Sequence, residues 1–164
     1  MTDSSVQNLD QHVALLTTSE NKRADAVRLG ANDVVLSSDR GAMRRIRRSL
    51  DVIIDTVSAP HDLDAELDLL RRDGTLVLLG GSPEPHPAPS VWSFITRRRR
   101  LAGSLIGGIA ETQEMLDFCA AKGIGADIEL IAPDRINEGY ERMLMSDVKY
   151  RFVIDVAQMP ASAT

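Results

Sequence analysis

Short apolar runs alternate with amphipathic segments along this chain, and this alternation constrains the fold more than any other feature. The apolar runs have the length of buried strands, and the segments between them carry apolar residues at helical spacing. A parallel sheet covered by helices on both faces accounts for such a pattern. We therefore predict an α/β fold with a three-layer parallel sheet.

The predicted elements follow from the apolar spacing and from capping residues. Strands are expected at residues 13–17, 34–36, 52–57, 75–79, 101–106, 128–131 and 151–155, and helices at 20–29, 41–50, 62–70, 112–122 and 136–145. Ser19 is expected to cap the first helix and Gly30 to end it. Apolar residues expected to face inward are Met43, Ile46, Met115, Leu116, Phe118, Cys119, Ile136, Tyr140 and Leu144.

Composition excludes several classes of protein. The 164 residues are enough for one domain, and only 4% of them are aromatic, so the core must be aliphatic. A net charge of -5 argues against a nucleic-acid or membrane-surface partner. One cysteine, Cys119, fits a reducing cytoplasm, and no apolar run approaches the roughly 20 residues of a membrane span. A cytoplasmic protein is expected.

Hydroxyl and basic side chains follow the first predicted strand, namely Thr18 and Ser19 and then Lys22 and Arg23. In parallel sheets, ligands lie beyond the carboxyl ends of the strands, and an NAD site places a carboxylate there. Hydroxyls with two cations instead suit the 2'-phosphate of NADP. The alternative is that Ser19 only caps a helix whose first turn is solvated.

No glycine-rich turn precedes this strand, because residues 1–11 contain no glycine. A G-x-G-x-x-G turn normally holds the pyrophosphate of a dinucleotide at a helix N-terminus. Losing two or three amide contacts, at roughly 1.5 to 3 kcal/mol each, removes on the order of 3 to 9 kcal/mol of binding. Because about 1.4 kcal/mol is tenfold in affinity, NADP binding is expected to be weak or lost.

Four consecutive arginines occupy positions 97–100. A patch that binds nucleic acid would carry interleaved aromatic side chains for base stacking, and this run lacks them. We predict a solvated edge and no nucleic-acid partner.

Several longer motifs occur in a fixed order. They are TTSENKR at 17–23, LGANDVV at 29–35, GSLIGG at 103–108, ETQEMLDF at 111–118, INEGYERM at 136–143 and DVKYRFVID at 147–155. Together they resemble the zinc-type medium-chain alcohol dehydrogenases, most closely the NADP-dependent cinnamyl-alcohol dehydrogenase branch. The resemblance implies a Rossmann-like NADP-binding domain at 12–157, after a segment foreign to the family at 1–11 and before a disordered tail at 158–164.

The resemblance also implies roles for individual residues. Thr18, Ser19 and Lys22 match positions that hold the 2'-phosphate, with Arg23 as a weaker candidate. Thr56, Val57 and Ser58 match the loop that passes the ribose and adenine. Gly80, Ser104, Leu105 and Ile106 match strand ends on the nicotinamide side, and Arg151 matches an arginine that reaches the pyrophosphate.

The resembled enzymes oxidise alcohols and reduce aldehydes with a zinc ion held in an N-terminal domain, which this sequence does not contain. Cys119 is expected in the core, and His12, His61 and His86 lack the spacing of metal ligands. We predict no catalytic residue, no metal site and no turnover by the isolated chain.

The resemblance makes the first predicted strand the second of a sheet ordered 3-2-1-4-5-6, so that the central strand is missing. Strands without a neighbour expose unpaired backbone N–H and C=O groups, which can pair with another strand or another chain. Three outcomes are open: residues 5–9 insert as a strand, the two halves close directly, or another chain fills the gap.

Two other functions stay open. The resemblance implies a homodimer across the edge from Val91 to Ile106. As a separate alternative, the chain is a non-catalytic module that dimerises or docks on an intact dehydrogenase. Alternatively, the chain is the remnant of a longer reading frame, which the genomic sequence upstream of Met1 tests.

Overall fold

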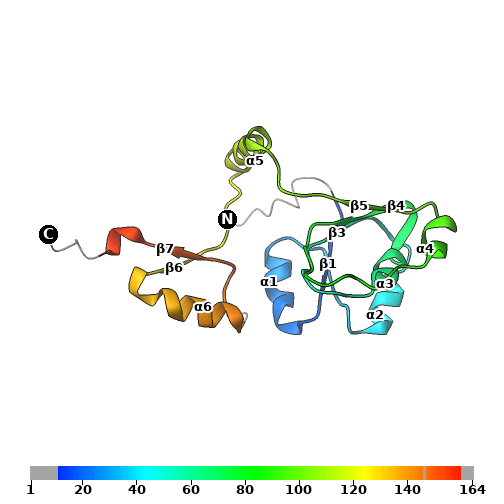
Figure 1. Cartoon of the computed structure of the whole chain (residues 1–164), viewed down its shortest axis with the longest axis horizontal. Helices are drawn as coiled ribbons and strands as arrows, with labels where there is room; N and C mark the ends of the chain where they lie inside the picture. Colours follow the sequence, from blue (N-terminus) through cyan, green and yellow to red (C-terminus); the bar gives the residue numbers. More distant parts are fainter. Residues whose placement is uncertain (1–10, 146, 160–164) are drawn as a thin grey trace. The chain divides into compact units, whose positions relative to one another are not determined.

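The computed structural model describes residues 11–145 and 147–159, which form two compact units. The first unit ends at Asp117 and the second begins at Phe118. Figure 1 is coloured along the sequence, so the first unit runs from blue to green and the second from yellow to red. The expectations for residues 1–11 and 158–164 lie almost wholly outside the described residues, and the predicted domain bounds stay a prediction. Within the described ranges, no helix has the length and apolarity to cross a bilayer.

The first strand pair forms as predicted. Strands β1 (Ala14–Thr17) and β2 (Asp33–Leu36) run parallel, with Thr17 opposite Leu36. Helix α1 (Arg23–Arg28) connects them, preceded by a 3-10 turn over Glu20–Lys22. Gly30 follows α1 at φ 103°, a conformation that favours glycine. Ser19 occupies the N-cap position of the 3-10 turn, but its side chain makes no capping hydrogen bond.

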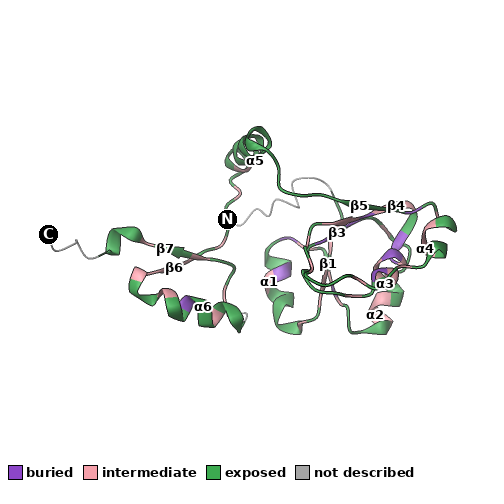
Figure 2. Cartoon of the chain, viewed as in Figure 1, coloured by how far each residue is buried: buried purple, intermediate pink, exposed green. Residues whose placement is uncertain are grey.

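A second parallel sheet contains β3 (Leu50–Asp55), β4 (Leu70–Leu78) and β5 (Arg100–Gly103), in that spatial order. Helices α2 (Arg40–Arg45), α3 (Leu63–Leu67) and α4 (Val91–Ile95) connect the strands of this unit. The core is aliphatic, as composition predicts, and Figure 2 shows its buried residues on α3 and β4. Its members are Ile53, Leu63, Leu67, Leu69, Leu70 and Leu76, with Met43 and Ile46 of the α2 region packed against them.

Two helices are shorter than predicted. The helix expected to continue to Leu50 ends at Arg45, since Arg48 adopts φ 60° and the chain enters β3. The helix expected to reach Leu70 ends at Leu67, because the Leu69 carbonyl accepts hydrogen bonds from Ser49 N and Leu50 N of the β3 segment. Residues 71–74 are therefore part of β4, whose register against β3 shifts there.

In the described part of the first unit, no backbone hydrogen bonds join its two sheets. Strand β1 pairs with β2 and strand β3 with β4, and among the described residues β1 and β3 are not hydrogen-bonded neighbours. Leu16 of β1 nevertheless packs against the core that β3 and β4 share. One of the three predicted outcomes is that the two halves of the sheet close directly on each other. This outcome is wrong for the described residues, because no backbone hydrogen bonds form between β1 and β3. Residues 5–9 lie outside the described part of the chain.

The second unit holds a smaller parallel pair, β6 (Glu129–Ile131) and β7 (Phe152–Ile154), connected through α6 (Ile136–Leu144). Gly139 of α6 is buried, and a Cβ there would lie 3.1 Å from Ile131 Cδ1. The predicted inward face of α6 is wrong in this structure, because Tyr140 is 62% and Leu144 88% exposed.

Helix α5 (Ile109–Lys122) spans the boundary between the units. None of its residues is buried, and Met115, Leu116 and Phe118 are each at least 42% exposed. The prediction that these side chains face a core is wrong here. An amphipathic pattern indicates that a face can be covered, but it does not supply the surface that covers it.

Candidate functional site

The carboxyl ends of β3, β4 and β5 meet at one edge of their sheet, as parallel strands must. Asp55 O accepts hydrogen bonds from Leu79 N at 2.8 Å and Gly80 N at 3.1 Å. One strand further along, Leu78 O accepts from Ser104 N at 3.1 Å. The structure therefore brings together the predicted loop of Thr56, Val57 and Ser58 with Gly80 and Ser104.

Gly80 lies against the backbone of the neighbouring loop. A Cβ built on Gly80 would lie 2.3 Å from Val57 O and 2.7 Å from Thr56 C. No side chain fits at that separation, so this position requires glycine for reasons of space. The next residue, Gly81, has nothing within 4 Å of its Cβ position. The close approach of Gly80 to Thr56 and Val57 holds the loop after β3 and the loop after β4 at the same edge of the sheet.

Leu105 and Ile106 follow β5 and are 88% and 89% exposed. Large apolar side chains at this exposure, adjacent to a strand end, are available to contact a ring or another chain. Their predicted place on the nicotinamide side stays a prediction.

Thr18, Ser19 and Lys22 lie directly after β1. The Ser19 amide donates to Thr17 Oγ1 at 3.2 Å, which fixes the backbone where the hydroxyls begin. Lys22 is exposed, and its ammonium has no hydrogen-bond or ion-pair partner among residues 11–145 and 147–159. The three side chains are thus close in sequence and available to an anion.

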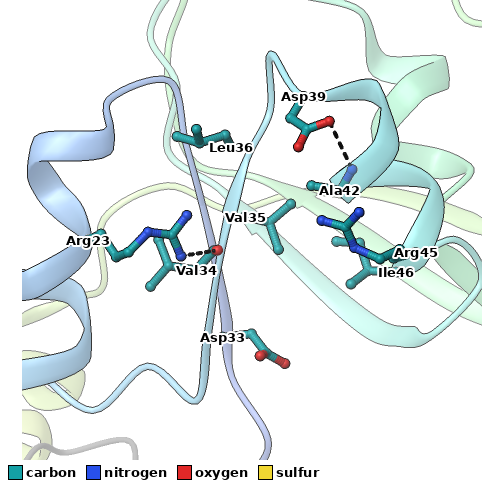
Figure 3. Close-up of a pocket in the computed structure, with 9 residues that line it drawn as sticks. All are labelled: Arg23, Asp33, Val34, Val35, Leu36, Asp39, Ala42, Arg45 and Ile46. Carbon is teal, nitrogen blue, oxygen red and sulfur yellow. Dashed lines mark hydrogen bonds between the residues drawn. The ribbon is translucent and has the colours of Figure 1, made fainter.

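Arg23 is committed to other groups. Its Nε lies 2.5 Å from Glu20 Oε1, and Nη1 donates to the Val34 carbonyl of the edge strand β2 at 2.9 Å. The hydrogen bond from Arg23 lowers the pKa of the Glu20 carboxyl. Figure 3 shows the Arg23 guanidinium beside β2, in a pocket of about 340 Å³ whose opposite wall includes Arg45. Arg23 therefore neutralises Glu20 and covers a strand edge.

Arg151 belongs to the second unit, where it immediately precedes β7 and its carbonyl accepts from Glu129 N at 2.9 Å. Its side chain is exposed. Its predicted role at the pyrophosphate stays a prediction.

A second group of polar residues gathers at the end of β3, and the spacing of the sequence does not predict it. Asp55, at the end of β3, has a side chain only 2% exposed. His61 Nε2 lies 3.1 Å from Asp55 Oδ2 and 3.5 Å from Glu66 Oε1 of α3. We call Asp55, His61 and Glu66 the carboxylate–histidine cluster. The ring of His86 packs edge-on against His61, with centroids 4.8 Å apart.

Burial and mutual charge shift the proton affinities of this cluster. Burial raises the pKa of Glu66, and the nearby Asp55 carboxylate raises it further. Burial alone opposes the charged form of His61, but the Ala59 carbonyl and the two carboxylates outweigh it, so its pKa is raised. Spacing along the chain did not reveal the cluster, because strand β3, the following loop and α3 each supply one member.

The raised pKa values of Glu66 and His61 predict that the free energy of unfolding depends on pH. Because the folded state holds protons on Glu66 and His61 more tightly than the unfolded state, their contribution is complete below the ordinary pKa values of about 4.5 and 6.5. It is lost as the pH rises through the raised values. We expect the free energy of unfolding to fall less steeply with rising pH in Glu66→Gln than in the wild type. Urea unfolding between about pH 5 and about pH 8, with a chelator to exclude stray metal ions, measures this difference.

The exposed Glu114 of α5 supplies the control for this prediction, since Glu114→Gln should keep the full pH dependence. Identical slopes for wild type and Glu66→Gln would contradict the assignment.

Comparisons with known proteins find alcohol dehydrogenases and related reductases. A family model described as zinc-binding dehydrogenase matches residues 7–135. The aldehyde reductase YahK of Escherichia coli is 58% identical over 144 residues, which cover 88% of this chain and 41% of the reductase. The NADP-dependent alcohol dehydrogenase C of Mycobacterium tuberculosis is 50% identical over 147 residues, which cover 90% of this chain and 42% of that enzyme.

Solved structures agree. A cinnamyl alcohol dehydrogenase from Sorghum bicolor superposes with a TM-score of 0.89 at 39% identity, covering 96% of this chain and 45% of that one. A cinnamyl alcohol dehydrogenase from Helicobacter pylori complexed with NADP(H) gives 0.77 at 35% identity, covering 91% and 42%. The predicted family and the α/β Rossmann-like fold are confirmed. The chain spans less than half the length of the relatives it matches.

Proposed function

Because the chain belongs to the zinc-binding dehydrogenase family, we propose that it is the NADP-binding part of an oxidoreductase acting on alcohols and aldehydes. Relatives named as aldehyde reductase and NADP-dependent alcohol dehydrogenase support the substrate class and the coenzyme. When bound, the nicotinamide supplies or accepts the hydride. The residues of this chain hold and orient that coenzyme.

The observation that carries the preference for NADP is the exposed ammonium of Lys22, which follows Thr18 and Ser19 and has no partner in the part of the chain that the structure describes. A 2'-phosphate accepts charge-assisted hydrogen bonds from such donors. The one carboxylate within this turn, Glu20, is held by Arg23, so it does not repel a phosphate at full strength. A free carboxylate here would instead select the ribose hydroxyls of NAD.

The remaining coenzyme contacts are proposed along the strand ends. The backbone of Thr56, Val57 and Ser58 would line the ribose and adenine, and Gly80 keeps the neighbouring strand end free of a side chain. Ser104, Leu105 and Ile106 would face the nicotinamide, and Arg151 the pyrophosphate. We expect the isolated chain to bind NADP weakly, because residues 1–11 contain no glycine and therefore no glycine-rich turn that could hold the pyrophosphate.

The residues present do not match the zinc ligands of this family. Alcohol dehydrogenases bind zinc with thiolates and imidazole, and Cys119 is the single cysteine of the chain. We therefore derive no zinc-dependent step here. Turnover is proposed to need the remaining length of the relatives, and we expect no aldehyde reduction by this chain alone.

Replacing Lys22 tests the coenzyme assignment. Thermal shift at millimolar coenzyme should show more stabilisation by NADPH than by NADH in the wild type. Lys22→Gln should lose roughly tenfold to a hundredfold in NADPH affinity, the worth of one hydrogen bond to a charged group. NADH binding should stay unchanged.

Lys122→Gln, on α5, removes an equal charge outside the proposed site and should retain the preference. Equal weakening of NADPH binding by both variants would show a non-specific charge effect and contradict the proposal.

A homodimer across the edge from Val91 to Ile106 is a second proposal. Exposed apolar side chains at this edge favour it, since Trp92 is 70%, Ile95 61% and Leu101 41% exposed. Light scattering should give twice the monomer mass, and Trp92→Glu should shift the protein toward monomer. A monomer at high concentration would remove the proposal.

A further inference from the structure

We infer that Asp55, His61 and Glu66 form a binding site for a divalent transition-metal ion, with Zn²⁺ as the representative. This inference is independent of the proposed coenzyme site. It is based on how one imidazole nitrogen is presented to two carboxylates.

The tautomer of His61 follows from its neighbours. Its Nδ1 lies 2.9 Å from the carbonyl oxygen of Ala59, which can only accept a hydrogen bond. Nδ1 must therefore carry the hydrogen. In the neutral ring, Nε2 then presents its lone pair to the carboxylates of Asp55 and Glu66. A backbone carbonyl that fixes the ring in this way is the usual support of a metal-binding histidine.

Three electron-rich atoms facing one another repel unless a proton or a metal ion lies between them. Nε2 of His61 and Oε2 of Glu66 are both buried, and neither has a hydrogen-bond partner among residues 11–145 and 147–159. Although Asp55 Oδ2 is only 3.1 Å from Nε2, this contact lacks the geometry of a hydrogen bond. The cluster thus has buried ligand atoms whose lone pairs are not used within the described protein.

The spacings suit a metal ion. Bonds of about 2.1 Å at tetrahedral angles separate ligand atoms by about 3.4 Å. The two distances from His61 Nε2 are 3.1 and 3.5 Å, and one ligand atom from each residue lies within 4.8 Å of the others. The carboxylate–carboxylate separation must contract on binding, which the rotatable side chain of Glu66 allows.

The ligand atoms of the cluster are buried, although two of its three side chains are partly exposed. The side chain of Asp55 is 2% exposed, whereas those of His61 and Glu66 are 21% and 17% exposed. Because Nε2 of His61 and Oε2 of Glu66 are themselves buried, the exposed part of these side chains lies on other atoms, and a metal ion would enter by rotation of the Glu66 side chain. Three protein ligands leave the fourth position of a tetrahedral zinc ion for water. The His61 amide lies 3.4 Å from His86 Nδ1 as a hydrogen-bond donor, which further orients the loop.

Calorimetric titration of the chelator-stripped full chain with ZnCl₂ tests the inference, and Co²⁺ absorption reports the ligand set. We expect one saturable site whose affinity falls at least a hundredfold in His61→Gln. Glu66→Gln, which changes shape least, should weaken binding at least tenfold. The exposed histidine His12, paired with Asp33, gives the matched control, and His12→Gln should bind as the wild type does.

Each result decides the inference. Selective loss in His61→Gln and Glu66→Gln, with a circular dichroism spectrum like that of the wild type, supports it. No Zn²⁺ binding at millimolar concentration would show that a proton occupies the cluster and would overturn it. Equal binding by the wild type and Glu66→Gln would also overturn it, because the ion would then lie elsewhere. If His61→Gln fails to fold, Glu66→Gln and His12→Gln still decide.

Discussion

We expect Gly80→Ala to lower the free energy of unfolding by about 3 kcal/mol or more. The new methyl group would lie 2.3 Å from Val57 O and 2.5 Å from Val57 C. Both atoms are backbone, so the clash cannot be relieved by rotating a side chain. Relief requires β4 to move away from β3, which would stretch the hydrogen bonds from Leu79 N and Gly80 N to Asp55 O. Urea unfolding at fixed pH measures the loss.

Gly81→Ala is the matched control, since it adds the same methyl group one residue later. Its Cβ position has nothing within 4 Å, so a change within about 0.5 kcal/mol is expected. Equal destabilisation by the two variants would mean that chain flexibility, and not the contact with Val57, sets the cost. The same pair tests the proposed site, because only Gly80→Ala should disturb the loop that is proposed to hold the ribose.

The strands were predictable because buried parallel strands read as apolar runs. The helix ends were less predictable from the sequence, and Leu69 and Leu70 show why. Both continue the apolar spacing of α3, yet both are buried with the strands, and Leu69 O accepts from Ser49 N and Leu50 N. Local pattern alone does not decide between the two roles, because tertiary hydrogen bonds make the choice.

Alpha-helix α4 was missed, although Ser90 was a signal for it. The Ser90 hydroxyl accepts a hydrogen bond from Trp92 N and so marks a helix start. Four prolines precede it, at positions 83, 85, 87 and 89, and a proline-rich segment is typical of a loop.

The candidate site was predictable where a topological rule applied. Thr56, Gly80 and Ser104 follow three parallel strands, and such ends always meet at one edge. No comparable rule connects His61 with His86, which lie 25 residues apart and meet only through the loop before α4. The members of the carboxylate–histidine cluster are close in sequence, but β3, the following loop and α3 each supply one, so no simple spacing predicts that they meet.

The arginine run at 97–100 shows how composition can mislead. A solvated edge was predicted, and this is wrong for Arg99, whose side chain is only 3% exposed. Its Nε and Nη2 donate to the carbonyl of Leu70 at 3.1 and 2.7 Å, and Nη1 donates to Ser93 O at 3.2 Å. Burial lowers the pKa of Arg99, and Asp68 partly offsets this from 3.8 Å. Arg99 therefore joins β4 to α4 from within the unit.

We expect Arg99→Ala to lower the free energy of unfolding by about 3 to 5 kcal/mol. It leaves the carbonyl of Leu70, a fully buried residue, without these donors, and it opens a cavity beside the core. Arg99→Met fills most of that volume and removes the cost of burying a charge, so it should recover part of the loss. Thermal and urea unfolding of both variants separate the cavity from the missing hydrogen bonds.

The neighbouring Arg98 provides the comparison within the same run. Its side chain is 66% exposed and pairs with Asp73 at 2.6 Å, and exposed ion pairs contribute up to about 1 kcal/mol. Arg98→Ala should therefore cost about 1 kcal/mol or less. If Arg99→Ala cost no more than Arg98→Ala, the guanidinium of Arg99 would have to be hydrated in solution. The original expectation of a solvated edge would then hold for the whole run.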